Sequence, residues 1–372
     1  MKFSILQKDL LNSLQVISSV VPVRSATPIA ENILFTVEKN ILQITGTDIE
    51  VSMRTEIPIK ESITPGSIAL PGKIITEMIR SLPNIPITFE TDDNNKVKIT
   101  TDKGVYSLSG ISQENYPELP SLSEEKSISI ASDKLKRMLT KTIFAVSSEE
   151  LRPALMGVYF QIMKDELRMV ATDGHRLSKI VDTDFSYDQD PVMMIIPPKA
   201  VQIAIKNFRE NGLTKIQFSN EALSFTFDST VLYTRLVEGE YPDYEKVIPR
   251  ENEYKLTVDK ELLISATKRV SIFSSALTHQ IRYSLIQNSL KIQSEDVDIG
   301  GEAKEELSVE YSGEEMDIGY NAEYILDILK HIDEDKVLFH LNSPVKATLV
   351  TPIEQKENES FVMLIMPIKL SS

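Results

Sequence analysis

The chain opens with the stretch FSILQKDLLNSLQVI at residues 3–17, where a short alternating segment passes into apolar residues at helical spacing. The same strand-then-helix pattern returns as ISIASDKLKRMLTKTI at residues 128–143 and as YKLTVDKELLISATKRV at residues 254–270. Each copy carries Asp or Lys near the start of the helix, and Asp favours a helix N-terminus. A pattern that recurs at such long intervals indicates an internal repeat of domain size.

Three further landmarks follow in the same order. A strand that runs into an acidic turn is seen in LQITGTDIEVS (42–52), LRMVATDGHRLS (167–178) and LKIQSEDVDIG (290–300), and the aspartates Asp48, Asp173 and Asp296 are 125 and 123 residues apart. A second helix is predicted from GKIITEMIRSL (72–82), PKAVQIAIKNF (198–208) and NAEYILDILKHI (321–332). In the first two copies a strand then ends at a Tyr-Pro turn. The repeat period is therefore about 125 residues.

We predict an α+β fold with three copies of one domain, each with two helices and antiparallel sheets on the other side. The predicted domains are residues 1–122, 127–249 and 253–372, because the polar stretches 121–126 and 250–253 separate the copies. The helices are expected over residues 8–20, 73–81, 133–145, 199–210, 259–270 and 321–332.

Composition places the chain among ordinary globular proteins and narrows its chemistry. Its 372 residues are 41% hydrophobic and 26% charged. Cysteine is absent, which excludes disulfides and thiolate chemistry and fits a reducing cytoplasm. The first twenty residues are interrupted by polar side chains, and no apolar run approaches the roughly 18 residues that suggest a membrane span. We therefore expect a cytoplasmic protein without a membrane partner.

The charge is unevenly distributed along the chain. The formal net charge is −15, yet the expected helices hold 14 lysines and arginines against eight acidic residues, which leaves −21 for the remainder. One interpretation is that these are ordinary solvated helix faces. The other is a cationic surface that attracts the phosphates of duplex DNA without reading its sequence. No base-reading module is present, so any contact is expected with the DNA backbone.

Helix dimensions limit how such a surface can meet DNA. Six helices packed about 8–10 Å apart in a ring leave almost no central space once their own thickness is subtracted. Twelve helices leave a hole of roughly 24 Å, which admits a duplex. A ring around DNA therefore requires two chains.

Several motifs carry a family resemblance. They are the opening MKF, TPI (27–29), TGTDIE (45–50), ATDGHRLS (171–178), EGEYPDY (238–244), YSGEEMDIGYN (311–321) and MPIKL (366–370). With these motifs the chain resembles the bacterial DNA polymerase III beta subunit, the sliding clamp family, over essentially its whole length. The resemblance implies a head-to-tail homodimeric ring around duplex DNA, with no catalysis, cofactor or metal. The implied partners are the replicative polymerase, a separate clamp-loading ATPase and other peptides that carry a clamp-binding motif.

The resemblance also implies three groups of site residues. A pocket for partner peptides is expected from Leu155, Thr172, Gly174, His175, Arg176, Leu177, Pro242, Val247, Val345, Leu364, Met366, Pro367 and Ile368. The dimer interface is expected from Tyr106, Leu108, Ile272 and Phe273, with Lys96, Lys98 and Lys103 facing Glu302, Glu305 and Glu306. For DNA it implies loop contacts from Arg24 and Arg152, and the cationic helices add Lys73, Arg80, Lys136, Arg137, Lys141, Lys199 and Lys206.

The acidic turn of the second copy differs in sequence from the acidic turns of the first and third copies. Copies one and three read TDIEVS and EDVDIG, whereas copy two reads TDGHRLS. We expect Gly174 to permit a backbone conformation closed to Ile49 or Val297. A feature that the fold requires would recur in all copies, so this turn favours a function confined to the second domain.

Two other classes of function compete with a clamp. A hydrolase would centre on Asp173 and His175, as a metal site or a base with its orienting group. The chain has four histidines, no HExxH pattern, no GxSxG elbow and no P-loop, which argues against an enzyme. A structural repeat scaffold without a nucleic-acid role is the third possibility.

Overall fold

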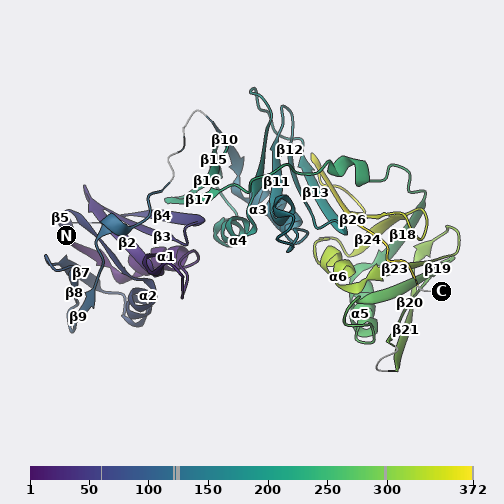
Figure 1. Cartoon of the computed structure of the whole chain (residues 1–372), viewed down its shortest axis with the longest axis horizontal. Helices are drawn as coiled ribbons and strands as arrows, with labels where there is room; N and C mark the ends of the chain where they lie inside the picture. The colour runs from purple at the N-terminus through teal and green to yellow at the C-terminus, as the bar shows by residue number, and fades with distance from the viewer. Residues whose placement is uncertain (60, 120–121, 123–125, 297–299, 371–372) are drawn as a thin grey trace. The chain divides into compact units, whose positions relative to one another are not determined.

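The computed structural model describes residues 1–59, 61–119, 122, 126–296 and 300–370. Each sequence repeat is built from two smaller units with the same order, in which one strand and one helix precede a group of three strands (Figure 1). The period of about 125 residues therefore contains a second, shorter repetition that sequence analysis did not predict.

The elements of the three repeats are as follows. The first repeat contains β1 (Lys2–Leu6), α1 (Gln7–Ile17), β2 (Asn32–Glu38), β3 (Ile41–Thr47), β4 (Val51–Pro58), β5 (Glu61–Thr64), β6 (Gly66–Pro71), α2 (Gly72–Ser81), β7 (Pro86–Thr91), β8 (Lys96–Thr100) and β9 (Val105–Ser109). The second contains β10 (Ser127–Ala131), α3 (Ser132–Ile143), β11 (Val158–Ile162), β12 (Leu167–Thr172), β13 (Arg176–Asp182), β14 (Val192–Ile196), α4 (Pro198–Asn207), β15 (Leu213–Phe218), β16 (Ala222–Phe227) and β17 (Thr230–Arg235). The third contains β18 (Tyr254–Asp259), α5 (Lys260–Ser271), β19 (Gln280–Ile286), β20 (Ser289–Asp296), β21 (Gly301–Ser308), β22 (Glu310–Tyr311), β23 (Met316–Asn321), α6 (Ala322–Lys330), β24 (Lys336–Leu341), β25 (Thr348–Pro352) and β26 (Glu359–Ile365). Four short 3-10 helices are η1 (Pro28–Glu31), η2 (Gln113–Asn115), η3 (Pro153–Met156) and η4 (Tyr244–Val247).

Strand pairing ties the two units of a repeat together. The first strand of each unit pairs with the three-strand group of the other unit, which gives the strand orders β1-β7-β8-β9 and β6-β2-β3-β4 in the first repeat. The second repeat follows with β10-β15-β16-β17 and β14-β11-β12-β13, and the third with β18-β24-β25-β26 and β23-β19-β20-β21. The pairings of β1 with β7, β10 with β15, β18 with β24 and β19 with β23 are antiparallel, and each repeat is an α+β domain as predicted.

Two antiparallel junctions join the repeats into larger sheets. Strand β17 pairs with β4, and the result is an eight-stranded sheet shared by the first and second repeats. Strand β26 pairs with β13, and the result is a nine-stranded sheet shared by the second and third. The compact units of the chain are accordingly residues 1–137 with 196–236, and residues 138–195 with 237–372.

The predicted domain limits follow the repeats and not these compact units. The first expected boundary, residues 121–126, lies mostly outside the described residues. The second, residues 250–253, lies outside helices and strands. The division into 1–122, 127–249 and 253–372 stays a prediction.

All six predicted helices are present, with ends shifted by up to three residues. Helix α1 buries Leu10, Leu14 and Ile17, a spacing of four and three that keeps one apolar stripe on the sheet. Helix α4 ends at Asn207, because the next residue, Phe208, turns into extended backbone and is buried. With the observed limits the helices hold 13 lysines and arginines against six acidic residues, a net charge of +7.

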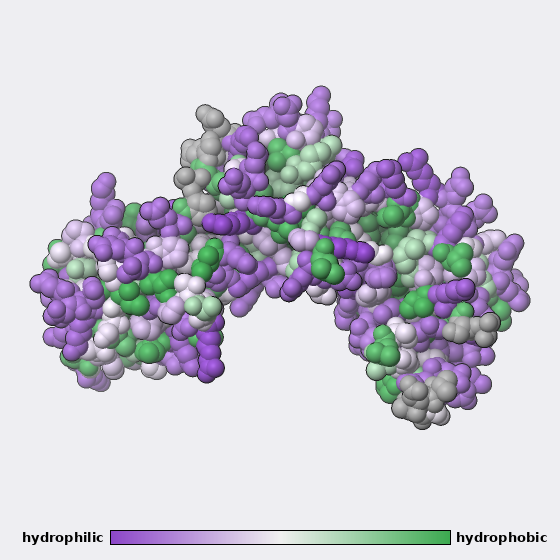
Figure 2. Space-filling model, in the orientation of Figure 1, coloured by the Kyte–Doolittle hydropathy of each residue, from purple (hydrophilic) through white to green (hydrophobic). Residues whose placement is uncertain are grey.

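The surface matches the charged composition. The face shown in Figure 2 is mostly hydrophilic, with separate hydrophobic patches. No helix in the described part of the chain is both long and apolar enough to cross a membrane.

Candidate functional site

The candidate site is an apolar cavity of about 610 Å³ that lies within the second compact unit. Four segments form its walls: η3, the turn between β12 and β13, residues 238–247, and the end of β26. Its lining contains Arg152, Pro153, Ala154, Leu155, Thr172, Gly174, Arg176, Leu177, Glu238, Gly239, Glu240, Pro242, Asp243, Tyr244, Val247, Leu364 and Met366. A cavity of this size with a few polar groups fits a short apolar peptide segment.

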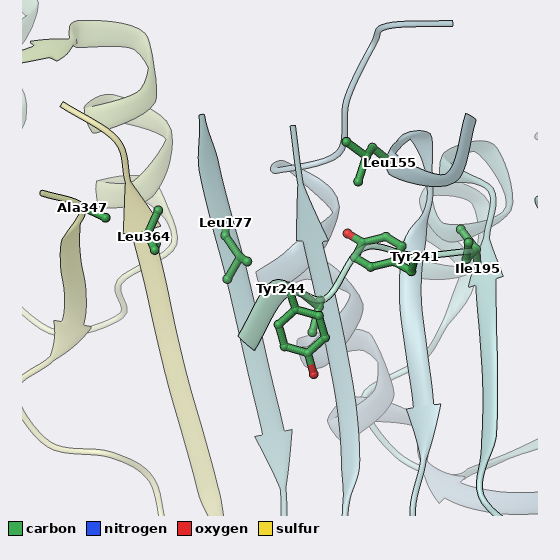
Figure 3. Packing of buried hydrophobic residues seen from close by; sticks show 8 residues of the cluster. Leu155, Leu177, Ile195, Tyr241, Tyr244, Ala347 and Leu364 are labelled. Atoms are coloured by element: carbon green, nitrogen blue, oxygen red, sulfur yellow. The ribbon is translucent and has the colours of Figure 1, made fainter. Parts of the chain in front are cut away.

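The cavity rests on a packed hydrophobic cluster (Figure 3). Leu177 on β13 lies directly opposite Leu364 on β26, so the junction between the second and third repeats passes through the floor. Beside it Tyr241 stacks on Tyr159 with ring centroids 4.4 Å apart, and the Tyr244 hydroxyl donates to Gln161 Oε1 at 2.6 Å. Most side chains of the floor belong to paired strands or to this aromatic stack.

One wall is the acidic turn that the sequence singled out. Asp173 Oδ1 accepts hydrogen bonds from the backbone N–H groups of His175 and Arg176, both at 2.9 Å. Gly174 has a φ of +90°, a conformation that favours glycine. Both oxygens of Asp173 are engaged, since Oδ2 accepts from Arg176 Nε at 3.1 Å. The aspartate therefore shapes the turn.

The prediction that this backbone conformation is closed to Ile49 is wrong. Ile49 occupies the corresponding position and adopts a φ of +85°, nearly the same value. In that turn Asp48 Oδ1 accepts from the N–H groups of Glu50 and Val51, at 3.1 and 2.7 Å. Val297 of the third repeat lies outside the described residues. The side chains of the turn, and not its backbone path, therefore distinguish the second repeat from the first.

Arg176 connects the cavity wall to the third repeat. Its Nη1 donates to Asp327 Oδ2 on α6 at 2.8 Å, and its guanidinium carbon lies 4.5 Å from the centroid of the Tyr324 ring. Phe144 covers it from another side at 5.5 Å. A planar guanidinium can stack on aromatic rings and bind carboxylates at the same time, and a lysine at this position would do so less well.

Most of the residues predicted for the peptide pocket lie together in the cavity lining. These are Leu155, Thr172, Gly174, Arg176, Leu177, Pro242, Val247, Leu364 and Met366. Four predicted residues lie outside the lining. His175 is exposed with its ring 6.4 Å from that of Tyr324, and Val345 is 73% exposed. Pro367 and Ile368 belong to the tail, where Ile368 N donates to the carbonyl of Gly319 on β23.

Several lining residues are not among those that the sequence predicts. Tyr244, Glu238 and Glu240 stand inside the quoted EGEYPDY motif, so the motif was the available signal. Pro153 and Ala154 on η3 carried no such signal. Arg152 was predicted for DNA, and the structure places it in the cavity wall, with Glu149 at 3.7 Å.

The first junction carries a smaller counterpart, a cavity of about 140 Å³. It is lined by Ile49, Glu50, Glu118, Tyr233, Thr234 and Arg235. Strand pairing places Tyr233 and Arg235 where the second junction has Leu364 and Met366. The same fold thus leaves room for a peptide segment at the second junction and little room at the first.

The residues predicted for DNA have diverse surroundings. Arg24, Lys73, Arg80 and Lys206 are exposed. Lys136 donates to the carbonyl of Phe208 at 3.1 Å, Arg137 is half-buried, and Lys199 pairs with Asp48. Lys141 differs from the prediction, because it is buried and binds Asp333 at 2.7 Å and the carbonyl of His331. We leave Lys141 out of any phosphate-binding surface.

The residues predicted for the dimer interface lie on β8, on β9 and the turn between them, on β21 and beyond the end of α5. Tyr106 is 39% exposed, Ile272 71% and Phe273 36%, while Leu108 is half-buried. Lys96, Lys98, Lys103, Glu302 and Glu306 are exposed. Glu305 differs from the expected pairing with a lysine, because Arg269 on α5 donates to both of its oxygens at 2.7 and 2.6 Å. The hydrogen bonds from Arg269 lower the pKa of Glu305.

No group of three or more histidine, aspartate or glutamate side chains among the described residues is arranged to hold a metal ion. Around Asp173 and His175 the geometry is that of a turn, with the carboxylate committed to backbone donors and Arg176.

Comparisons with known proteins cover the whole chain. Family models described as the N-terminal, central and C-terminal domains of the DNA polymerase III beta subunit match residues 1–120, 129–243 and 245–369. The beta sliding clamp of Pseudomonas aeruginosa is 30% identical over 371 residues, and that of Chlamydia pneumoniae is 31% identical over 375. These alignments span 100% of this chain and 100% and 99% of the two relatives.

Solved structures of sliding clamps are similar to this chain over its full length. A crystal structure of the P. aeruginosa sliding clamp bound to griselimycin is 30% identical, covers 100% of both chains and gives a TM-score of 0.94. The sliding clamp of Bacillus subtilis gives a TM-score of 0.92 at 27% identity, again over 100% of both chains.

Proposed function

The chain belongs to the DNA polymerase III beta subunit family and is a sliding clamp, and from this premise we propose that it encircles duplex DNA as a head-to-tail homodimer. In this proposal the ring tethers the replicative polymerase and other partners without carrying out a reaction itself.

The two internal junctions use the same register. The strand pairings within each repeat show which residues of the three repeats correspond. Tyr106 on β9, Leu232 on β17 and Met363 on β26 form one set of corresponding residues. Met53 on β4, Ser178 on β13 and Ala303 on β21 form the other set. Leu232 lies opposite Met53 at the first junction, and Met363 lies opposite Ser178 at the second. A single pairing rule therefore joins each repeat to the next.

In the described chain, this pairing rule leaves one strand of each set without a partner strand at a junction. Strand β21 corresponds to β4 and β13, and strand β9 corresponds to β17 and β26, yet β21 and β9 are sheet edges in the described chain. An exposed edge strand invites pairing with another chain. Transferring the register pairs Ala303 of one chain with Tyr106 of a second, and Glu302 with Ser107. The same interaction on both sides closes a ring, as heterologous contacts do when their rotation closes.

Contacts between helix ends support a third junction of the same kind, formed between two chains. At the first junction Asn207, at the end of α4, donates to Ser19 just after α1, at 3.4 Å. At the second, His331 after α6 stacks on Phe144 after α3, with ring centroids 4.0 Å apart. The corresponding residue after α5 is Ile272, which is 71% exposed. In the dimer Ile272 and Phe273 would be covered by the end of α2 of the second chain.

The helices are the proposed DNA-facing elements. They carry +7 in a chain of −15, and phosphate contacts need charge without base reading. On the helices, the exposed candidates are Lys73, Arg80, Lys199 and Lys206, and the half-buried ones are Lys136 and Arg137. Arg24 and Arg152 are exposed candidates outside the helices. Encirclement keeps the protein on DNA topologically, so weak and mobile contacts suffice.

The apolar cavity is the proposed docking site for partner peptides. Its volume of about 610 Å³, its packed apolar floor and the adaptable Met366 in its lining suit a short segment with apolar anchors. The polymerase and the clamp loader are the proposed owners of such segments. A cytoplasmic, non-enzymatic protein without cofactors fits this role.

The observation that carries the proposal is the shared register with its unpaired remainder, β9 and β21. Light scattering of the full chain tests it, with an expected mass of about twice 41.9 kDa. A mass of 41.9 kDa at micromolar concentration would leave both edges unpaired and contradict the ring.

A further inference from the structure

The wall of the apolar cavity between η3 and residues 238–247 carries negative charge beside apolar side chains. Glu238, Glu240 and Asp243 all line the cavity, and all three are exposed. Gly239 between the two glutamates has a φ of +126°, and a Cβ there would lie 3.5 Å from that of Ala154. The glycine therefore holds a tight turn against η3, with a carboxylate on each side of it at the cavity.

The cationic residues of the lining are engaged with other acids. Arg176 binds Asp173 and Asp327, with distances of 3.1 and 2.8 Å, and Arg152 lies 3.7 Å from Glu149. Asp243 has its own cation in Lys246, at 2.9 Å. Glu238 and Glu240 have no ion pair within the residues that the structure describes. The net local charge available to a ligand is therefore that of two carboxylates.

We propose that this cavity selects partner segments that carry a lysine or arginine next to their apolar anchors. The inference rests on the proposed peptide-docking function and adds the charge of the partner. An apolar segment is held by burial in the cavity, and opposite charge at the rim adds attraction and discriminates among segments. A segment flanked by aspartate or glutamate meets like charge at the same place.

Two synthetic decapeptides test the proposal on the full-length protein. Both carry the same leucine and phenylalanine anchors, and the flanking polar positions are lysine in one and glutamate in the other. At about 50 mM salt we expect the lysine peptide to bind roughly threefold to tenfold more tightly, because exposed pairs contribute modestly. The difference should shrink towards unity near 0.5 M salt, where the Debye length falls well below 10 Å.

Matched variants assign the effect to the two glutamates. Glu238→Gln combined with Glu240→Gln should remove most of the preference and leave the dimer mass unchanged. The control is Glu354→Gln with Glu357→Gln, which changes the charge equally in exposed residues near the start of β26, at the end opposite Met366. This control should keep the full preference.

Three outcomes would overturn the proposal. Equal affinities for the two peptides would retain peptide docking but eliminate charge selection. A preference that survives in the Glu238→Gln, Glu240→Gln protein would place the selection elsewhere. Binding of neither peptide would reject the cavity as a peptide site and the charge selection with it, while the light-scattering test of the ring would stand separately.

Discussion

The ring of His331 makes the junction between the second and third repeats sensitive to pH. Its ring stacks on Phe144 at 4.0 Å, and its Nδ1 lies 2.7 Å from the carbonyl of Asp327. Burial lowers the pKa of His331 below 6.5, the nearby Lys141 and Lys330 charges lower it further, and the hydrogen bond to Asp327 opposes them. The folded ring therefore stays neutral where the unfolded ring already binds a proton.

We predict that His331→Asn reduces the pH dependence of stability below pH 6.5. Since the pKa is lowered in the folded state, the contribution of the neutral ring is complete above 6.5 and is lost as pH falls through the folded pKa. At pH 8 the variant should be less stable by about 0.5–1.5 kcal/mol, because the stack is lost. Asparagine retains a bond to the carbonyl four residues earlier, as Asn207 does with Ile203 at 2.8 Å. Urea midpoints at pH 8 and pH 5.5 measure this, and a gap between the proteins that does not narrow at pH 5.5 would refute it.

Asp327 positions Arg176 in the cavity wall without lining the cavity itself. Burial alone would raise the pKa of Asp327, but hydrogen bonds from Arg176 and Lys330 lower it below 3.8. The carboxylate is thus charged at neutral pH, and its contribution is lost only as pH falls below that value.

We predict that Asp327→Asn weakens binding of an apolar-anchor peptide by roughly threefold to tenfold at pH 7.5, because Arg176 loses its charged partner. Calorimetric titration measures the affinity. Asp333→Asn is the control, since Asp333 lies just after α6, binds Lys141 on α3 and does not line the cavity. An unchanged affinity in Asp327→Asn, or an equal loss in Asp333→Asn, would show that Arg176 is not positioned in this way.

The role of Lys141 could not be predicted from the sequence. It stands on a helix rich in lysine and arginine, so its charge predicted phosphate binding. In the fold it is buried against Asp333 and lies 5.4 Å from the centroid of the Phe361 ring. Both of these partners come from the third repeat, 192 and 220 residues along the chain, so no local sequence pattern predicts them.

At the scale of elements, the helices were predictable and the sheet pairings were not. Apolar spacing in α1 and α3 is local, so periodicity found all six helices. The pairing of β1 with β7, or of β26 with β13, joins distant segments whose register depends on tertiary packing. The same limit explains Val345, which was placed in the pocket but is exposed, while Ala347 contributes to the cluster beneath it.

The edge strands β9 and β21 predict a specific register between two chains. The transferred register places Ser107 of β9 opposite Glu302 of β21 in a second chain, and both side chains are exposed. Because the chain has no cysteine, Ser107→Cys with Glu302→Cys introduces one pair at each interface. Opposed residues in antiparallel strands have Cα atoms about 4.5–5.5 Å apart, which suits a disulfide.

Oxidation of this double variant should yield a covalent dimer on a non-reducing gel. Ser109→Cys with Glu302→Cys is displaced by two residues, about 7–8 Å, and should cross-link poorly. Equal cross-linking of the two proteins, or efficient cross-linking only of the displaced pair, would contradict the register.

At the scale of the whole molecule, the triplication was visible because four landmarks recur in order. What the sequence did not reveal is that each repeat is itself doubled, since the two units share little beyond their order of elements. Nor did it reveal that sheets cross the repeat limits, so that compact units and repeats differ. Both features depend on strand pairing between distant segments.

Closure around DNA is the claim on which the proposed function depends, and it is tested with the Ser107→Cys, Glu302→Cys protein. The ring is assembled on nicked circular DNA under reducing conditions and then oxidised, and the DNA is washed at about 1 M salt, where backbone contacts are screened. We predict that the covalent dimer stays on the circle and is released when one restriction cut linearises the DNA. Loss from the intact circle at high salt, or retention on the linear form, would contradict encirclement.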